Sequence, residues 1–119
     1  MGKNNIEKGS LGEDIAVNYL KSKGYEILDR NYRTSIGEID IIAIREDILV
    51  FVEVKSRTNF NYGYPYESVN WKKQEKIIKS SYIYMKYRNL YKYQIRYDII
   101  QVYLQKEAKI HHIENAFCG

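Results

Sequence analysis

The sequence predicts a mixed α/β fold, because segments with helical spacing and segments with strand spacing alternate along its 119 residues. One helix pattern comes first, three strand patterns follow it, and a second helix pattern precedes the last strands. The length suits a single domain over residues 1–119, long enough to bury a core and short for two domains. We find no internal repeat and no low-complexity tract, and the only proline marks no linker.

The first helix is predicted over residues 11–21, and Gly24 follows it as a stop. Its apolar positions recur with helical spacing; they are Leu11, Ile15, Ala16, Tyr19 and Leu20. On a helical wheel of about 100° per residue, Glu13 falls between Leu20 and Val17, inside the apolar arc, whereas Asp14 falls outside it. An inward carboxylate needs a partner, and the candidates are the surroundings of a metal ion, a second ion or Lys55.

A strand over residues 25–33 and a hairpin follow, with Glu46 and Asp47 at the hairpin tip. An even-membered loop fixes the register. The residues that it places opposite each other are Asp40 and Glu53, Glu38 and Lys55, and Ile42 and Phe51. Opposed residues share a face, so the charged residues are expected on one face, above Ile42 and Phe51. The other face is expected to be apolar, with Ile39, Ile41, Ala43, Val50, Val52 and Val54.

The second half of the chain begins with an irregular loop over residues 58–67, which contains Gly, Asn and Pro among aromatic residues. Asn70 is a suitable cap for a second helix that ends near residue 89. Its apolar stripe is predicted to contain Trp71, Ile78, Tyr82 and Met85, and its basic flank Lys72, Lys73, Lys76 and Lys79. Strands are predicted over residues 94–104 and 110–113.

Composition and charge exclude several classes of protein. The net charge of +4 permits a polyanionic partner without requiring one. The single cysteine, Cys118, rules out an intramolecular disulfide and a thiolate zinc cluster, which suits a reducing compartment. No apolar run approaches the roughly 18 residues of a membrane span, and the N-terminus lacks the apolar centre of a signal peptide. We therefore expect a cytoplasmic protein. No phosphate-cradling glycine loop and no serine or cysteine triad is evident.

The charged face of the hairpin predicts a metal site. Directly opposed residues have Cβ atoms about 4.5 to 5.5 Å apart, and two carboxylates at that distance repel unless a cation joins them. Mg²⁺ prefers oxygen ligands and usually takes one or two carboxylates, so Asp40 and Glu53 suit it, with Mn²⁺ as a substitute. The Val54 carbonyl offers a third oxygen. The Lys55 ammonium is placed to orient water or to neutralise charge on a phosphate.

These residues resemble the PD-(D/E)XK nuclease superfamily, in which an Asp precedes an E-x-K strand. The wider pattern resembles the YraN family of small bacterial proteins over nearly the whole chain. Its segments here are GSLGEDIAVNYL, GYEILDRNYR, GEIDIIA, LVFVEVKSR, KKQEKI, RYDII and HIENAF. The resemblance implies a restriction-endonuclease-like α/β core with a central mixed sheet flanked by helices, similar to Holliday junction resolvases, and metal-dependent cleavage of nucleic acid.

The same resemblance implies roles for individual residues. Asp40 and Glu53 would be metal ligands, Lys55 the catalytic lysine, Glu13 the helix acid and Gln74 a helix glutamine of related nucleases. Ile39 stands where the superfamily name writes a proline, a common departure that removes no ligand.

Structural roles compete with each of these assignments. Asp40, Glu53 and Lys55 could form salt bridges on a solvated sheet face. Glu13 could simply favour the N-terminal end of its helix. Gln74 could be a surface residue. The lysines at positions 72, 73, 76 and 79 could contact phosphates or form an ordinary solvated flank. Arg57 could clamp a phosphate or pair with Glu38, which could also pair with Lys55.

Other polar and aromatic residues have competing interpretations as well. Tyr62, Tyr64 and Tyr66 could stack on bases, although packing explains most tyrosines equally. His111 and His112 are neighbours on a strand and point to opposite faces, so joint metal ligation is not expected and neither is given a role. Asp98 is expected to pair with Arg96 or Arg33.

The sequence thus predicts a Mg²⁺-dependent endonuclease that hydrolyses phosphodiester bonds in DNA, including branched recombination or repair intermediates. In the expected mechanism a metal held by Asp40 and Glu53 activates water, Lys55 assists, and water attacks phosphorus in line. One alternative is a nucleic-acid-binding module that keeps this fold without hydrolysis. Another is a protein-interaction domain that uses its exposed tyrosines. Cutting duplexes or junctions needs two sites, which favours a homodimer.

Overall fold

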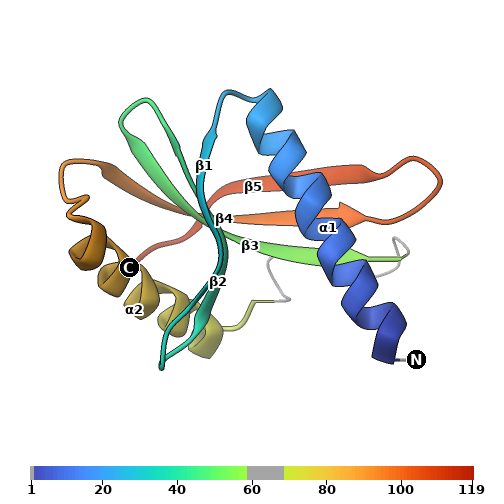
Figure 1. Ribbon diagram of the computed structural model, residues 1–119, viewed down its shortest axis with the longest axis horizontal. Helices are drawn as coiled ribbons and strands as arrows, with labels where there is room; N and C mark the ends of the chain where they lie inside the picture. The colour runs from blue at the N-terminus through green and yellow to red at the C-terminus, as the bar shows by residue number, and fades with distance from the viewer. Residues whose placement is uncertain (1, 59–68) are drawn as a thin grey trace.

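The computed structural model describes residues 2–58 and 69–119, with side chains from Ser10 onward, and is shown in Figure 1. Its elements in chain order are α1 (Gly2–Ser22), β1 (Glu26–Arg33), β2 (Glu38–Arg45), β3 (Ile48–Arg57), α2 (Trp71–Arg88), β4 (Gln94–Tyr103) and β5 (Lys109–Phe117). The expected loop over residues 58–67, with Tyr62, Tyr64 and Tyr66, lies almost entirely outside the described residues.

The strands form one five-stranded sheet in the order β1-β2-β3-β4-β5. The pairs β1–β2, β2–β3 and β4–β5 are antiparallel, whereas β3 and β4 are parallel. A parallel pair needs a crossover connection, and α2 lies in the one between β3 and β4. The prediction of an α/β fold with a central mixed sheet flanked by helices is confirmed.

The two helices cover opposite faces of the sheet (Figure 1). On one face Ala16, Val17 and Leu20 of α1 pack with a cluster that includes Ile41, Ala43, Val50, Val52, Ile100 and Val102. On the other face Ile77, Tyr84 and Met85 of α2 pack with a cluster that includes Ile42, Leu49, Phe51, Tyr97 and Ile99. Strands β3 and β4 contribute to both clusters, because alternate residues of a strand point to opposite faces.

The helix caps follow the predicted chemistry. The Asn70 side chain accepts a hydrogen bond from the Lys73 backbone N–H at 2.9 Å, and Asn89 ends the helix in the left-handed region at φ 54°. Gly24 has φ +90°, as a stop after α1 requires. However, α1 begins at Gly2, well before residue 11. The prediction relied on apolar spacing, which starts only at Leu11. The backbone hydrogen bonds of a helix do not require apolar side chains, so the helix can begin earlier.

The predicted apolar stripe of α2 is wrong in part. Trp71 is 65% exposed and Tyr82 52% exposed, while Ser80, Ser81 and Tyr84 are fully buried. The serine hydroxyls are satisfied, since Ser81 Oγ lies 2.6 Å from the Tyr97 hydroxyl and Ser80 Oγ 3.1 Å from Thr34 Oγ1. Small serines let α2 approach the sheet closely, and hydrophobic spacing cannot detect such a face.

The hairpin register agrees with the prediction at its centre, where Ile42 pairs with Phe51. The tip turns at Glu46, which has φ 56°. The last strand is longer than expected, because β5 runs from Lys109 to Phe117. Within the described residues, neither helix combines the length and the apolar character that a membrane crossing demands.

Candidate active site

The candidate site lies where β2 and β3 separate. Their register runs from Arg45–Ile48 to Ile41–Val52, whereas β2 begins three residues earlier, at Glu38, and β3 continues to Arg57. Past this point β2 stays paired with β1, and β3 with β4. The sheet therefore forks at Asp40 and Glu53, and the fork leaves room for polar side chains between strands that are otherwise fully hydrogen-bonded.

The Asp40 carboxylate bridges the start of the fork. Its Oδ2 accepts a hydrogen bond from the Val54 backbone N–H at 2.8 Å. Because the N–H and C=O of a strand residue face the same neighbouring strand, the Val54 carbonyl also faces the fork. The predicted face assignment is wrong at Ile39, which packs in the α2 cluster with Ile42 rather than with Ile41. Regular alternation is lost at Asp40, since its carboxylate reaches the β3 backbone where the ladder ends.

A pocket of about 520 Å³ opens on the α2 side of the fork. Its acidic lining residues are Asp40, Glu53 and Glu38, and its basic ones are Lys72, Lys73 and Lys76, with Gly37, Asn70 and Ile77 completing the wall. A Cβ atom on Gly37 would lie 3.0 Å from the Lys76 Cβ, so a glycine permits the close approach of this turn to α2. The pocket therefore combines two recessed carboxylates with a basic rim.

Glu53 is the most buried charged group in the pocket, with only 4% of its side chain exposed. Two ammonium groups converge on its Oε2 atom: Lys73 Nζ at 2.6 Å and Lys55 Nζ at 3.6 Å. Lys55 lies two residues further along β3, and Lys73 reaches in from the first turn of α2. Glu53 and Lys55 lie together as the shared face predicts, whereas Lys73 was expected either as a phosphate contact or as part of a solvated helix flank.

The electrostatics of the fork bias Asp40 toward its neutral form. Burial, together with the nearby charge of Glu53, raises the pKa of Asp40 to about 8, despite the hydrogen bond from Val54. Burial and the neighbouring Lys73 lower the pKa of Lys55. Burial alone would lower the pKa of Lys73 as well. The hydrogen bond and the charge of Glu53 outweigh burial, so the pKa of Lys73 is raised.

Glu13 points inward, as the helical wheel predicts, with 17% of its side chain exposed against 56% for Asp14. Burial raises its pKa, and its charge is one of those that raise the pKa of Asp40. Its cationic partner is Arg30 of β1, at 3.6 Å, rather than Lys55. In the part of the chain that the structure describes, no three His, Cys, Asp or Glu side chains are arranged to hold a metal ion.

The remaining predicted residues have other partners or positions than expected at the site. The Gln74 amide donates to the Val69 carbonyl at 2.9 Å, and Gln74 is not among the residues lining the pocket. Lys79 forms an exposed ion pair with Glu75. Glu38 pairs with Arg33 at 3.3 Å, so the expected pairing with Lys55 or Arg57 is wrong, because the ladder that would align them ends earlier. Arg57 lies at the end of β3, in register with Tyr103.

The model of the uncharacterised protein family UPF0102 matches residues 12–102. This match covers most of the chain, including the fork and its pocket. The chain belongs to the UPF0102 family. Because this family is YraN-like, the predicted membership is confirmed.

Relatives within UPF0102 match along nearly their full length. The UPF0102 protein of Clostridioides difficile strain 630 is 58% identical over 96% of this chain and 99% of its own. The UPF0102 protein of Caldanaerobacter subterraneus subsp. tengcongensis is 50% identical over 92% of this chain and 93% of its own. Among solved structures, Pyrococcus furiosus SfsA in complex with Ca²⁺ is similar with a TM-score of 0.37 and 17% identity. The similarity covers 92% of this chain and 63% of that one, and it is too low to support an argument.

Sequence reasoning missed one polar residue beside the site of this UPF0102 chain. Gln101 is 1% exposed and stands in register with Lys55 on the neighbouring strand, so the two share a face. Its Oε1 atom has no hydrogen-bond partner within residues 2–58 and 69–119. Buried acceptors are nearly always satisfied. The signal available in the sequence was a glutamine inside an otherwise apolar strand.

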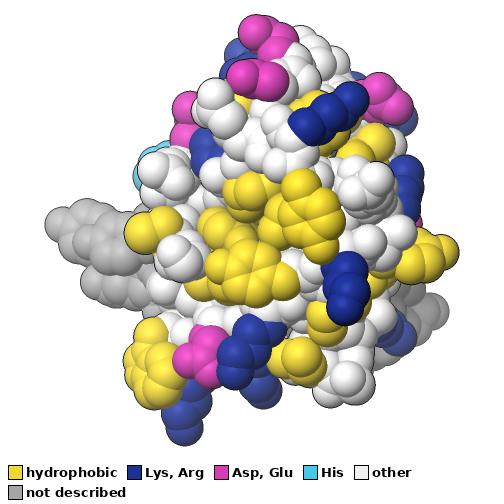
Figure 2. All heavy atoms as spheres, turned by 90° about the vertical axis from the view of Figure 1, so that its left-hand side faces the viewer, with side chains coloured by type: hydrophobic (Ala, Val, Ile, Leu, Met, Phe, Trp, Pro, Cys, Tyr) yellow, Lys and Arg dark blue, Asp and Glu magenta, His cyan; other side chains and the backbone are white. Residues whose placement is uncertain are grey.

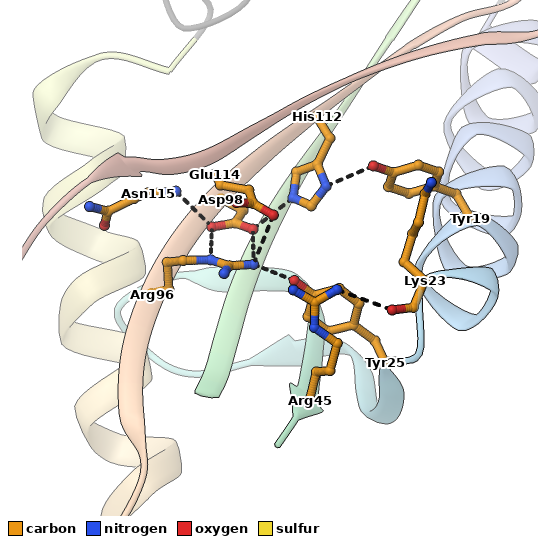
Figure 3. Close-up of polar contacts among 9 residues, drawn as sticks. All are labelled: Tyr19, Lys23, Tyr25, Arg45, Arg96, Asp98, His112, Glu114 and Asn115. Carbon is orange, nitrogen blue, oxygen red and sulfur yellow. Dashed lines mark hydrogen bonds and ion pairs between the residues drawn. The ribbon is translucent and has the colours of Figure 1, made fainter. Parts of the chain in front are cut away.

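A second polar cluster lies on the opposite face of the sheet, under α1 (Figure 3). Asp98 is fully buried and accepts hydrogen bonds from Arg96, from His112 Nε2 at 2.7 Å and from the Asn115 backbone N–H at 2.9 Å. The expected pairing of Asp98 with Arg96 is confirmed. His112, to which no role was assigned, continues the cluster to the Tyr19 hydroxyl at 3.0 Å. These contacts connect β4, β5 and α1.

Proposed function

We propose that this protein is a Mg²⁺-dependent endonuclease that hydrolyses phosphodiester bonds in DNA in the cytoplasm. The observation that carries the proposal is the pairing of two recessed carboxylates, Asp40 and Glu53, with Lys55 at a fork in the sheet. The resemblance of this pattern to the PD-(D/E)XK superfamily supports the same reaction and a restriction-endonuclease-like core. Its likeness to junction resolvases makes branched DNA the substrate to test first.

The donor set at the fork fits a hard divalent cation. Asp40, Glu53 and the Val54 carbonyl offer oxygen ligands, which Mg²⁺ and Mn²⁺ prefer. Burial first, and then the nearby charge of Glu53, raise the pKa of Asp40, and a bound cation would favour its ionised form. When bound, Mg²⁺ would supply a Lewis acid that neutralises charge on the phosphodiester.

Other residues at and around the fork divide the remaining tasks. Lys55, whose pKa is lowered by burial, is suited to accept a proton from the attacking water or to donate a hydrogen bond to a phosphate oxygen. Lys72 and Lys76 line the pocket beside the acids, where they can pair with phosphates on either side of the bond to be cut. Glu13 acts on Asp40 through its charge.

The metal site can be tested without knowing the substrate. Mn²⁺ titrated into isotope-labelled protein is expected to broaden the NMR signals of Asp40, Glu53 and Val54 first, because paramagnetic relaxation falls steeply with distance. Asp40→Asn is expected to abolish this localised broadening, whereas Glu75→Gln, which removes an exposed carboxylate from α2, should leave it unchanged. Diffuse broadening that is the same in all three proteins would contradict the metal site.

A cleavage panel then tests turnover on duplex, four-way junction, flap and RNA substrates. Asp40→Asn and Lys55→Met are each expected to reduce cleavage by at least about 100-fold, the usual effect of removing a metal ligand or a charge-stabilising group. Binding is followed separately through the fluorescence of Trp71, the only tryptophan in the chain. Salt-dependent binding without cleavage under either metal would favour the alternative, a binding module that keeps the fold.

A second copy of the chain is the partner that we propose for the end of the molecule shown in Figure 2. Hydrophobic side chains gather on that face. Tyr82, Ile95, Tyr97 and Cys118 line a hollow of about 270 Å³. Light scattering is expected to give twice the monomer mass of 14.2 kDa, and Tyr82→Arg is expected to reduce it to the monomer. A monomeric mass for the unaltered protein would contradict this.

A further inference from the structure

Lys73 occupies the position on Glu53 where a cation would bind. Its ammonium nitrogen lies 2.6 Å from Glu53 Oε2, a full ångström closer than the 3.6 Å of Lys55 to the same oxygen. A contact of this length is a strong charge-assisted hydrogen bond. In the metal-free protein, therefore, the buried carboxylate is neutralised mainly by the helix lysine and only loosely by the strand lysine.

A divalent cation and the Lys73 ammonium cannot both hold this oxygen. Mg²⁺ requires an approach of about 2.0 to 2.1 Å to a carboxylate oxygen. An ammonium group left within hydrogen-bond distance of the same atom would lie next to that ion, and the two positive charges would repel strongly in a recessed pocket. One of the two must leave this oxygen when the other binds it.

Lys73 is the group that can move. Glu53 is 4% exposed and fixed on the central strand, whereas the Lys73 side chain is 42% exposed and extends from the first turn of α2 on a flexible four-carbon stem. Lys72 and Lys76, its neighbours on the helix, line the same pocket. A displaced Lys73 ammonium therefore stays at the rim, among the cations that would meet a phosphate.

We infer that Lys73 stands in for the metal ion, holding Glu53 in the metal-free protein and moving to the phosphate of the nucleic acid when the ion enters. This inference rests on the proposed metal site. Lys73 is then a positioning residue that couples two binding events. An ion entering the fork releases a cation for the substrate, and a bound phosphate holds that cation away from Glu53 and strengthens metal binding.

The experiment compares Mn²⁺ affinity in the unaltered protein, Lys73→Met and Lys76→Met, by calorimetry in the absence of nucleic acid. Methionine keeps most of the length of the side chain and removes the charge. Lys76 is the matched control, because it lines the same pocket from the same helix. Lys73→Met is expected to bind Mn²⁺ at least about tenfold more tightly than the unaltered protein, and Lys76→Met less than about threefold more tightly, since of these two lysines Lys73 is the one that contacts Glu53. Thermal unfolding verifies that all three proteins are folded.

The possible results separate the inference from the proposed function. Equal affinities in all three proteins, abolished in each by Asp40→Asn, would overturn the role of Lys73 and leave the metal site intact. Equal gains in both lysine variants would also overturn it, since general charge removal would explain them. Absence of Mn²⁺ binding in every protein would overturn the metal site and the inference together.

A direct readout follows the lysine itself. In protein labelled at lysine ammonium groups, Mg²⁺ is expected to shift the ¹⁵N signal of Lys73 and change its exchange with water, while the signal of Lys76 moves little. The shift should be absent in Asp40→Asn. A Lys73 signal that stays constant while Mg²⁺ binds would contradict the displacement.

Discussion

Asp98→Asn is expected to lower the free energy of unfolding by about 3 to 5 kcal/mol, the usual consequence of removing one partner from a buried ion pair. Asp98 is fully buried and holds the guanidinium of Arg96 through two contacts, at 2.9 and 3.0 Å. An asparagine in its place would leave the Arg96 charge, itself only 13% exposed, without its buried counter-ion.

The hydrogen bonds around Asp98 show why an amide cannot substitute. Burial alone would raise the pKa of Asp98, but the hydrogen bonds from His112 and Arg96 outweigh it and lower that pKa. An ionised Asp98 requires His112 to donate from Nε2, so a neutral His112 accepts the Tyr19 hydroxyl at Nδ1. The substituted asparagine would have to present its NH₂ group to one of these donors, which breaks the chain of contacts to α1.

Glu114→Gln provides the matched control for this effect. Glu114 also faces Arg96, but at 3.7 Å and with 54% of its side chain exposed. Its removal is expected to change stability by less than about 0.5 kcal/mol, as for surface ion pairs in general. Urea unfolding at pH 7 compares the three proteins, and similar losses for both variants would contradict the claim that burial sets the size of the effect.

The position of the hairpin and of its acids could be predicted from sequence, because strand alternation and a tight loop depend on local spacing. Counting residues outward from the tip at Glu46 and Asp47 predicts that Asp40, Glu53 and Lys55 lie close together. The central register of the hairpin agrees with that count. The inward direction of Glu13 likewise follows from the helical period alone. These features depend on contacts that are short range in the sequence, or that are fixed by a single turn.

The fork itself could not be predicted, because it depends on how two strands separate in three dimensions. If regular alternation and pairing continued past Val52, Ile39 would lie on the same face as Ile41, and Glu38 would stand opposite Lys55. Both expectations are wrong, since β2 leaves β3 at this point. The contact between Lys73 and Glu53 joins distant positions in the sequence through a crossover whose geometry no local pattern determines.

Polar residues with structural roles were also hard to recognise. Ser80 and Ser81 form part of the buried face of α2, and hydrophobic spacing therefore selected the exposed Trp71 and Tyr82 in their place. No sequence pattern predicts a role for His112, because its partners, Tyr19 and Asp98, come from distant parts of the chain. Contacts between residues that are distant in the chain cannot be inferred from the spacing of a single sequence.

The metal-free protein is expected to lose stability as the pH rises from about 4 to about 8, and Asp40→Asn is expected to remove this loss. The pKa of Asp40 is raised from 3.8 to about 8, so in that interval the folded protein keeps a proton that the unfolded chain has released. Stability then falls by about 1.4 kcal/mol per pH unit, and it is constant with respect to this group below and above the interval.

At pH 8 and without metal, Asp40→Asn is therefore expected to be more stable than the unaltered protein by about 2 to 5 kcal/mol. Asparagine can still accept the Val54 N–H through its side-chain carbonyl. The groups that surround Asp40 are Glu13 from α1, Glu53 and Lys55 from β3, and Lys73 from α2, and all are present in both proteins. The difference between the two pH profiles consequently isolates Asp40.

Metal should reverse the order of the two proteins. Saturating Mg²⁺ at pH 8 is expected to stabilise the unaltered protein, because the ion binds the ionised Asp40 of the folded state, and to leave Asp40→Asn nearly unchanged. At pH 7, binding should release about one proton per ion, which calorimetry in two buffers of different ionisation enthalpy measures. Parallel pH profiles for the two proteins, or Mg²⁺ binding without proton release, would show that Asp40 is ionised at neutral pH. Parallel profiles combined with no binding of Mg²⁺ would make the fork an ordinary salt-bridged end of a sheet, because neither a retained proton nor a cation would then distinguish Asp40 from a paired surface carboxylate.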